Sequence, residues 1–161
     1  MAKARDVVGL LCNDPFGTAA ARVVSIRADE LFEHSEGVLD TSEIERLHDM
    51  RVASRRLRAA MEVFEPCFPR KRFRAALKEV KAIADALGER RDRDVSIIAL
   101  ETFGEALAAP DRRGIQVMVD QLHEEQLLAN DRLTPFVDRR RLSDLRERIG
   151  ELVAAADRRA A

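Results

Sequence analysis

The segment 44–64, IERLHDMRVASRRLRAAMEVF, concentrates basic side chains on what its apolar residues predict to be a helix. It holds His48 and five arginines, in a chain of 161 residues whose formal net charge is −1. Arginine keeps its charge, and its planar guanidinium can bind two phosphate oxygens at once. A row of such groups along one helix suits a linear chain of phosphates, so the segment is a candidate binding site for a polyanion.

The charge of the chain is unevenly distributed. Residues 46–93 contain 14 Lys/Arg and 7 Asp/Glu, whereas the rest of the chain contains 14 and 22. This division predicts a basic site on a protein that is otherwise acidic. A solvated helix surface with many salt bridges would give the same counts, so charge alone leaves both interpretations open.

Helical geometry separates the basic residues from the apolar ones. At 100° per residue, His48, Arg51, Arg55 and Arg58 lie within about 80° of one another, and Arg56 lies apart. The apolar residues fall on a different face; they are Met50, Ala53, Leu57, Ala60, Met61 and Phe64. Like charges at i, i+4 destabilise a helix, so helix stability does not explain the basic stripe.

The segment 70–87 repeats this pattern, with a second basic stripe beside an apolar face. Its members are Arg70, Arg74, Lys78 and Lys81. A hairpin through residues 65–71 would turn both stripes towards a common groove. Further arginines follow in the sequence GERRDRD and are expected at the next turn; they are Arg90, Arg91 and Arg93. Two such stripes on consecutive helices favour polyanion binding over a merely solvated surface.

The elements that must position these residues are helices. Seven glycines, five prolines and the absence of Trp and Tyr leave little material for a β-sandwich or barrel. Six helices are expected, over residues 17–36, 43–65, 70–87, 91–108, 112–130 and 142–158. Because the connections are short, we predict an all-α antiparallel helical bundle. It would form one domain over residues 1–161, in which residues 1–15 could be flexible.

Local signals mark some of the helix ends. Ser42 and Glu45 have the spacing of a capping box before the second expected helix, and Pro66 follows its end. Gly88 suits the C-terminal cap of the third helix. Asp92 suits the start of the fourth, where the helix dipole favours a carboxylate.

The sequence also indicates the cellular compartment in which the protein is expected. It contains no run of about 18 apolar residues, so no transmembrane helix is expected. The N-terminus lacks the apolar core and cleavage site of a signal peptide. Cys12 and Cys67 lack metal-type spacing and fit a reducing environment. We therefore expect a cytoplasmic protein.

Signals for catalysis are sparse. His34, His48 and His123 are scattered, and no HExxH or CxxC motif occurs. His48 could be a metal ligand or phosphoryl acceptor, but a hydrogen-bond donor within the basic stripe is the simpler interpretation. Asp92 and Asp94 could hold a cation, although Asp92 is also a candidate cap. We nominate no catalytic residue, metal ligand or cofactor.

Nucleic acid is a further alternative ligand. Single-stranded nucleic acid usually requires aromatic platforms for its bases, and the aromatic residues here are all Phe, at 4% of the chain. The basic stripe of residues 48–58 offers no Asn or Gln to recognise adenine in duplex DNA. Recognition of phosphates alone is the favoured interpretation.

Two motifs resemble those of the CHAD domain, a histidine-containing α-helical domain of prokaryotic polyphosphate-associated proteins. H-x-x-R-V-x-x-R-R-L-R begins at His48, and L-G-x-x-R-D-x-D-V begins at Leu87. The resemblance implies a helical bundle whose basic groove binds inorganic polyphosphate. It also implies triphosphate-tunnel enzymes or polyphosphate granules as partners. The resemblance makes the residues of the basic helix binding candidates, whereas the 70–81 stripe rests mainly on helical geometry.

The chain departs from the family pattern in one respect. Family members usually contain two such helical units, the second with its own His/Arg/Lys helix of the H-x-x-R-K-x-x-K-x-x-R-Y kind, and no such helix follows Val95. We therefore expect a homodimer as one way to double the site. Two apolar rows could supply its interface, or could instead close a monomeric bundle. They are Ile115, Val119 and Leu122, and Leu142, Leu145, Ile149 and Leu152.

Overall fold

The structure, a computed structural model, describes residues 3–160 and consists of helices. The α-helices are α1 (Phe16–Glu33), α2 (Ile44–Val63), α3 (Arg70–Glu105), α4 (Ala109–Leu133) and α5 (Arg139–Ala160). Short 3-10 turns, Glu65–Cys67 and Thr134–Phe136, follow α2 and α4. No strand occurs among the described residues. The predicted all-α antiparallel bundle is therefore confirmed, with five α-helices in place of six.

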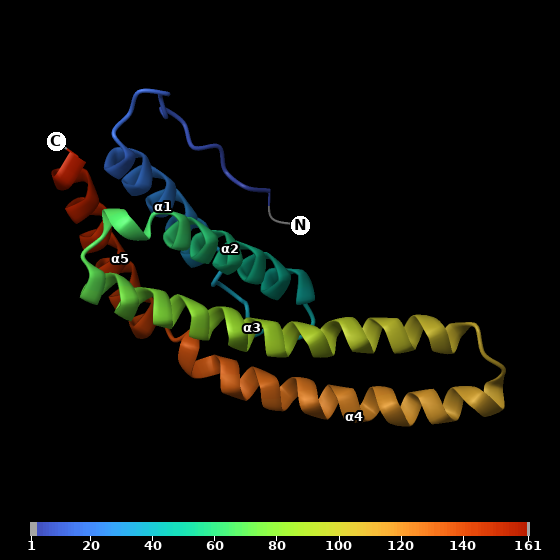
Figure 1. The fold of residues 1–161 in the computed structure, drawn as a ribbon. Coiled ribbons are helices and arrows are strands. Elements are labelled where there is room, and N and C mark those ends of the chain that lie inside the picture. Colours follow the sequence, from blue (N-terminus) through green and yellow to red (C-terminus); the bar gives the residue numbers. More distant parts are fainter. Residues whose placement is uncertain (1–2, 161) are drawn as a thin grey trace.

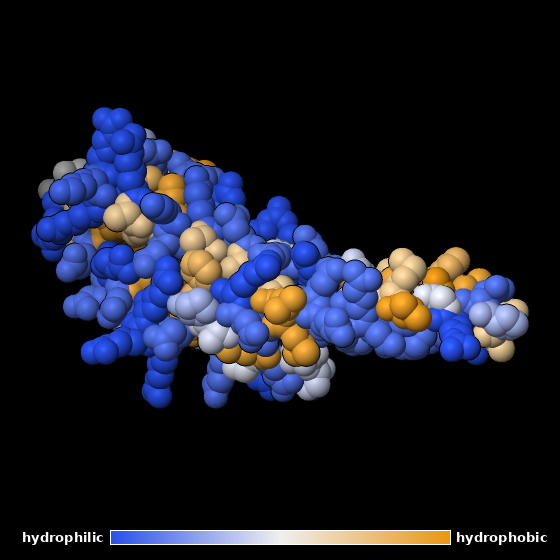
Figure 2. Space-filling view, turned by 90° about the horizontal axis from the view of Figure 1, so that it is seen from below, coloured by the Kyte–Doolittle hydropathy of each residue, from blue (hydrophilic) through white to orange (hydrophobic). Residues whose placement is uncertain are grey.

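The helices form a bundle with a projecting arm (Figure 1). Helices α1, α2 and α5 pack around the first half of α3, and the second half of α3 runs out beside α4. We call residues 92–128 the arm. Of the twelve exposed large apolar side chains in the described chain, seven lie on it. They are Val95, Ile98, Phe103, Val117, Met118, Leu127 and Leu128. Figure 2 shows groups of apolar residues along this part of the surface.

The bundle is held together by a continuous apolar core. Leu47 and Leu57 of α2 and Phe73 and Ile83 of α3 are almost fully buried. Each such side chain contributes about 1.5–3 kcal/mol through removal of apolar surface from water. This core fixes α2 against α3, so the basic residues on the flanks of both helices are carried by a stable pair of helices.

The two apolar rows predicted as a possible dimer interface differ in how far the chain itself covers them. Leu142, Leu145, Ile149 and Leu152 of α5 are buried in the core. In α4, Val119 is buried and its two neighbours in the row are partly covered. The α5 row therefore closes the monomer, the α4 row is only partly covered, and the homodimer stays a prediction.

Helix α3 runs without interruption through the position where a break was expected. The segments 70–87 and 91–108 form one helix of 36 residues, so Gly88 is not a cap and Asp92 does not start a helix. A glycine cap requires a left-handed conformation, which the described chain adopts only at Gly9 and Gly37. The residues that follow Gly88 are mostly good helix formers, and α4 packs along the continued helix.

The capping box predicted before α2 does not form. The Ser42 hydroxyl donates to Asp40 Oδ1 at 2.6 Å, and its oxygen accepts no hydrogen bond from an amide of α2. The helix starts after Glu43, with no side-chain cap. By contrast, Asp138 Oδ1 accepts hydrogen bonds from the amides of Arg140 and Arg141 at 3.0 and 3.1 Å and caps α5.

Replacing Gly88 with alanine should stabilise the protein. Glycine inside a helix costs about 1 kcal/mol relative to alanine. A Cβ at this position would meet only Arg51 Nε, at 3.9 Å, which is an ordinary contact. We expect Gly88→Ala to raise the melting temperature by about 2–4 °C in thermal unfolding followed by circular dichroism. An unchanged or lower melting temperature would show that the glycine is required for packing of α2 on α3.

Candidate functional site

The basic stripe of α2 lines a hollow between α2 and α3. Arg51, Arg55 and Arg58 form the α2 side of this hollow, which has a volume of about 610 Å³. Arg51 and Arg55 have no ion-pair partner among the described residues. Two cations that are not neutralised, on a stably packed helix, can bind an anion without first breaking a salt bridge.

Carboxylates form much of the opposite wall of the same hollow. Asp85, Glu89 and Asp92 of α3 line it, together with Arg93. The helices are antiparallel, so the middle of α2 lies level with this part of α3 and not with the basic residues near its start. The hollow is therefore mixed in charge, with cations on α2 and mainly anions on α3.

The basic stripe of α3 lies in a neighbouring hollow of about 410 Å³. Arg74, Lys78 and Lys81 line it, and Arg70 lies farther along, in a third hollow. Asp85 lines both this hollow and the α2 hollow. The expectation that both stripes face one common groove is therefore corrected. The stripes follow one another along the surface because the two antiparallel helices offset them.

Glu62 joins the two stripes where they meet. Its Oε1 lies 3.0 Å from Lys81 Nζ and 3.2 Å from Arg58 Nε. The hydrogen bond from Lys81 is the largest cause that lowers the pKa of Glu62 below its ordinary value; burial opposes it, and the hydrogen bond from Arg58 lowers the pKa further. The sequence analysis missed this residue, although Glu62 follows Arg58 by four positions and so continues the stripe.

His48 and Arg91 lie near the start of α2. His48 is partly buried, and its Nδ1 has no hydrogen-bond partner. The Arg91 side chain is 15% exposed, with Nη2 at 3.8 Å from Glu45 Oε1 and a buried Nη1 that lacks a partner. Buried polar atoms without partners are uncommon. The unpartnered atoms of both residues are closed off from the surface, and neither residue lines the hollows of the two stripes.

Two predicted site residues lie at interfaces between helices. Arg90 is fully buried and pairs with Asp94, which also accepts a hydrogen bond of 2.7 Å from Gln126 Nε2 of α4. Arg56 acts electrostatically on Glu30 of α1. Arg90 cannot reach a ligand on the surface, and Arg56 lies away from the hollows. Both arginines therefore connect helices of the fold.

The aspartates considered for a cation point in different directions. Asp94 is buried against Gln126, whereas Asp92 is exposed and lines the α2 hollow. They do not converge on one position, since they are two residues apart on a helix. Within residues 3–160, no group of three or more His, Cys, Asp or Glu side chains could hold a metal ion.

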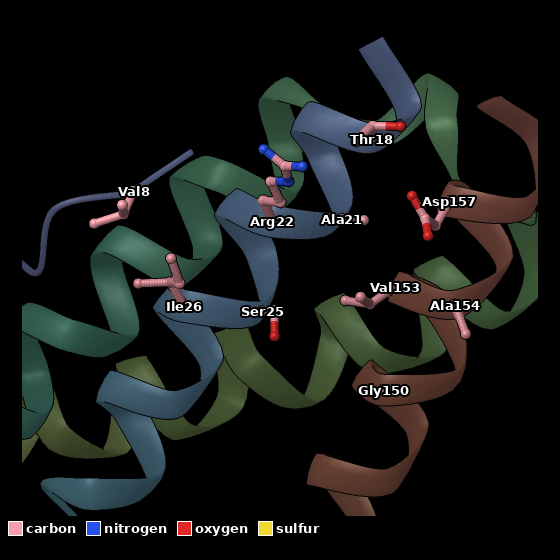
Figure 3. A pocket seen from close by; sticks show the side chains of 10 residues that line it. All are labelled: Val8, Thr18, Ala21, Arg22, Ser25, Ile26, Gly150, Val153, Ala154 and Asp157. Carbon is pink, nitrogen blue, oxygen red and sulfur yellow. The ribbon is translucent and has the colours of Figure 1, made fainter. Parts of the chain in front are cut away.

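A different hollow lies between α1 and α5 (Figure 3). It has a volume of about 470 Å³ and is lined largely by small side chains such as Ala21, Ser25 and Ala154. Its charged side chains are Arg22 and Asp157, and Arg22 is already bonded to the carbonyl of Gly9. This hollow has little cationic character, so it is not a second candidate for a polyanion.

The fold and the α2–α3 site define an all-α protein with basic helices. Comparison with known families then identifies the family. The family model of the CHAD domain matches residues 22–161, which is most of the chain. The chain belongs to the CHAD domain family. No curated protein and no solved structure matches it. Within the described residues, no helix has both the length and the apolar character needed to cross a membrane.

Glu30 is the acidic centre of the interface between α1 and α2. It is 2% exposed, and its Oε1 accepts hydrogen bonds of 2.5 Å from the Arg5 amide and Arg27 Nη1. Burial alone would raise the pKa of Glu30, but the Arg5 amide, Arg27 and Arg56 outweigh burial and lower it. The ionised carboxylate is therefore favoured in the folded protein.

Glu30 should make stability depend on acid pH. A lowered pKa in the folded state gives stability that is present above the unfolded value of about 4.5 and is lost as pH falls through the folded value. We expect Glu30→Gln to lose about 1–3 kcal/mol at neutral pH and to show a shallower loss between pH 5 and 3. Urea unfolding across this pH range measures both effects, with the exposed Glu36→Gln as control. Parallel curves for wild type and Glu30→Gln would contradict this account.

Proposed function

We propose that this protein binds inorganic polyphosphate, without changing it chemically, along the two basic stripes of α2 and α3. The observation that carries the proposal is a set of cations on these stripes with no ion-pair partner among the described residues. They are Arg51, Arg55, Arg70, Arg74 and Lys78. Membership in the CHAD domain family supports the same ligand.

The arrangement of the stripes favours a long, linear ligand. At 1.5 Å per residue, the cations from Arg51 to Arg58 span about 10 Å of α2 and those from Arg70 to Lys81 about 16 Å of α3. Because the stripes follow one another, a ligand that uses both must extend along the surface. A single phosphate or a short oligomer would contact one stripe only.

Recognition in this proposal depends on phosphates and not on bases. Phe73 is buried in the core and Phe64 packs against it, so neither offers an exposed face beside the stripes. Base stacking on aromatic side chains is a main source of affinity for single-stranded nucleic acid. A polymer made only of phosphates has no bases to stack, so it loses no affinity when exposed aromatic side chains are absent. Polyphosphate granules and triphosphate-tunnel enzymes of the cytoplasm are the partners that this proposal includes.

Removal of one unpaired arginine should weaken binding without unfolding the protein. We expect Arg55→Ala to reduce the affinity for long-chain polyphosphate roughly tenfold at low salt, because one charge-assisted contact is lost. The dependence of affinity on salt should become weaker as well. Arg55→Lys should give an intermediate loss, since it keeps the charge but not the planar guanidinium. Isothermal titration calorimetry at several salt concentrations measures these effects.

The matched control is Arg113→Ala, which removes an exposed arginine from the arm, far from both stripes. It should leave affinity nearly unchanged. Equal losses for Arg55→Ala and Arg113→Ala would show that the stripes are not the site. Chain length and free phosphate, followed on gels during the same incubations, should stay constant. Phosphate release that is lost in His48→Ala would instead establish a phosphohydrolase.

A further inference from the structure

Glu62 is placed where a bound phosphate chain would pass from one stripe to the other. Arg58 precedes it by one turn of α2, and Lys81 lies across from it on α3. The side chains of Arg58, Glu62 and Lys81 are each between 41% and 43% exposed. All three groups are thus accessible to a ligand at the surface. The Glu62 carboxylate already forms ion pairs with both cations.

We infer that Glu62 is an internal competitor of the polyanion and that a bound chain displaces it from Arg58 and Lys81. This inference rests on the proposed function, and it adds the residue that limits affinity at the junction of the stripes. The displaced carboxylate would turn to solvent, while phosphate oxygens take its place on the two cations. Glu62 is thereby a specificity-determining residue, and it is not a ligand-binding one.

The physical basis is that the ligand and the carboxylate use the same donors. Arg58 Nε and Lys81 Nζ both bond to Oε1 of Glu62, so neither can give that bond to phosphate until the carboxylate leaves. A carboxylate that stayed in place would also repel the chain. Because the ion pairs are partly exposed, each is weak and can be broken by a ligand that carries many charges.

This arrangement predicts a difference between ligands of different length. Tripolyphosphate can bind at Arg51 and Arg55, which lie about two to three turns of α2 away from Glu62, and leave the junction intact. A long chain that contacts Arg55 and also Lys78 has to cross the junction. The cost of displacing Glu62 therefore applies to long chains, and their many other contacts offset it.

The test is the affinity of Glu62→Gln for long-chain polyphosphate and for tripolyphosphate. Glutamine keeps the shape of the side chain and removes its charge. We expect the variant to bind the long chain roughly two- to tenfold more tightly than wild type at low salt, and tripolyphosphate with a smaller gain. The gain should shrink as salt is raised, because these exposed charges are screened. Glu147→Gln, an exposed carboxylate on α5, corrects for the change in net charge.

A double-mutant cycle separates displacement from a general charge effect. In the Arg58→Ala/Lys81→Ala background, Glu62→Gln should give no more gain than Glu147→Gln, since no donors remain to be released. A full gain in that background, or no gain beyond the control in wild type, would overturn the inference while leaving polyphosphate binding in place. Failure of the wild-type protein to bind polyphosphate would instead overturn the proposed function, and the inference with it.

Discussion

The antiparallel packing of α2 against α3 determines which charges become neighbours. Buried side chains such as Leu57 of α2 and Ile83 of α3 fix this pairing. Helical geometry then determines which residues lie on the flanks of both helices. The two basic stripes therefore cannot lie face to face. Repulsion between the cations on each stripe is tolerated because burial of the core stabilises the helices far more than like charges destabilise them.

The arginines of this chain fall into groups with different physical roles. Arg90 is buried in a pair with Asp94, where a charge without its partner would be strongly destabilising. Arg56 supports the carboxylate of Glu30 at the interface of α1 and α2. Arg51 and Arg55 have no such partner among the described residues. These unpaired guanidiniums, like those of Arg70 and Arg74 on α3, have their full hydrogen-bonding capacity available for a ligand.

The parts of the fold and of the site that depend on local periodicity could be predicted from the sequence. The all-α class, the bounds of α2 within two residues and the separation of the α2 stripe from its apolar face all follow from a 3.6-residue repeat. The break expected at Gly88 was wrong, since packing against α4 continues α3 through a residue of low helix propensity. The offset between the stripes depends on how two helices align, which no local pattern specifies.

The central claim is that the stripes recognise a chain of phosphates and not a nucleic acid. Competition between long-chain polyphosphate and duplex DNA for the full chain, at one fixed salt concentration, tests it most directly. At equal concentrations of phosphate, polyphosphate should displace labelled DNA completely, whereas DNA should displace little bound polyphosphate. Equal competition by the two polymers, or stronger competition by DNA, would contradict the account.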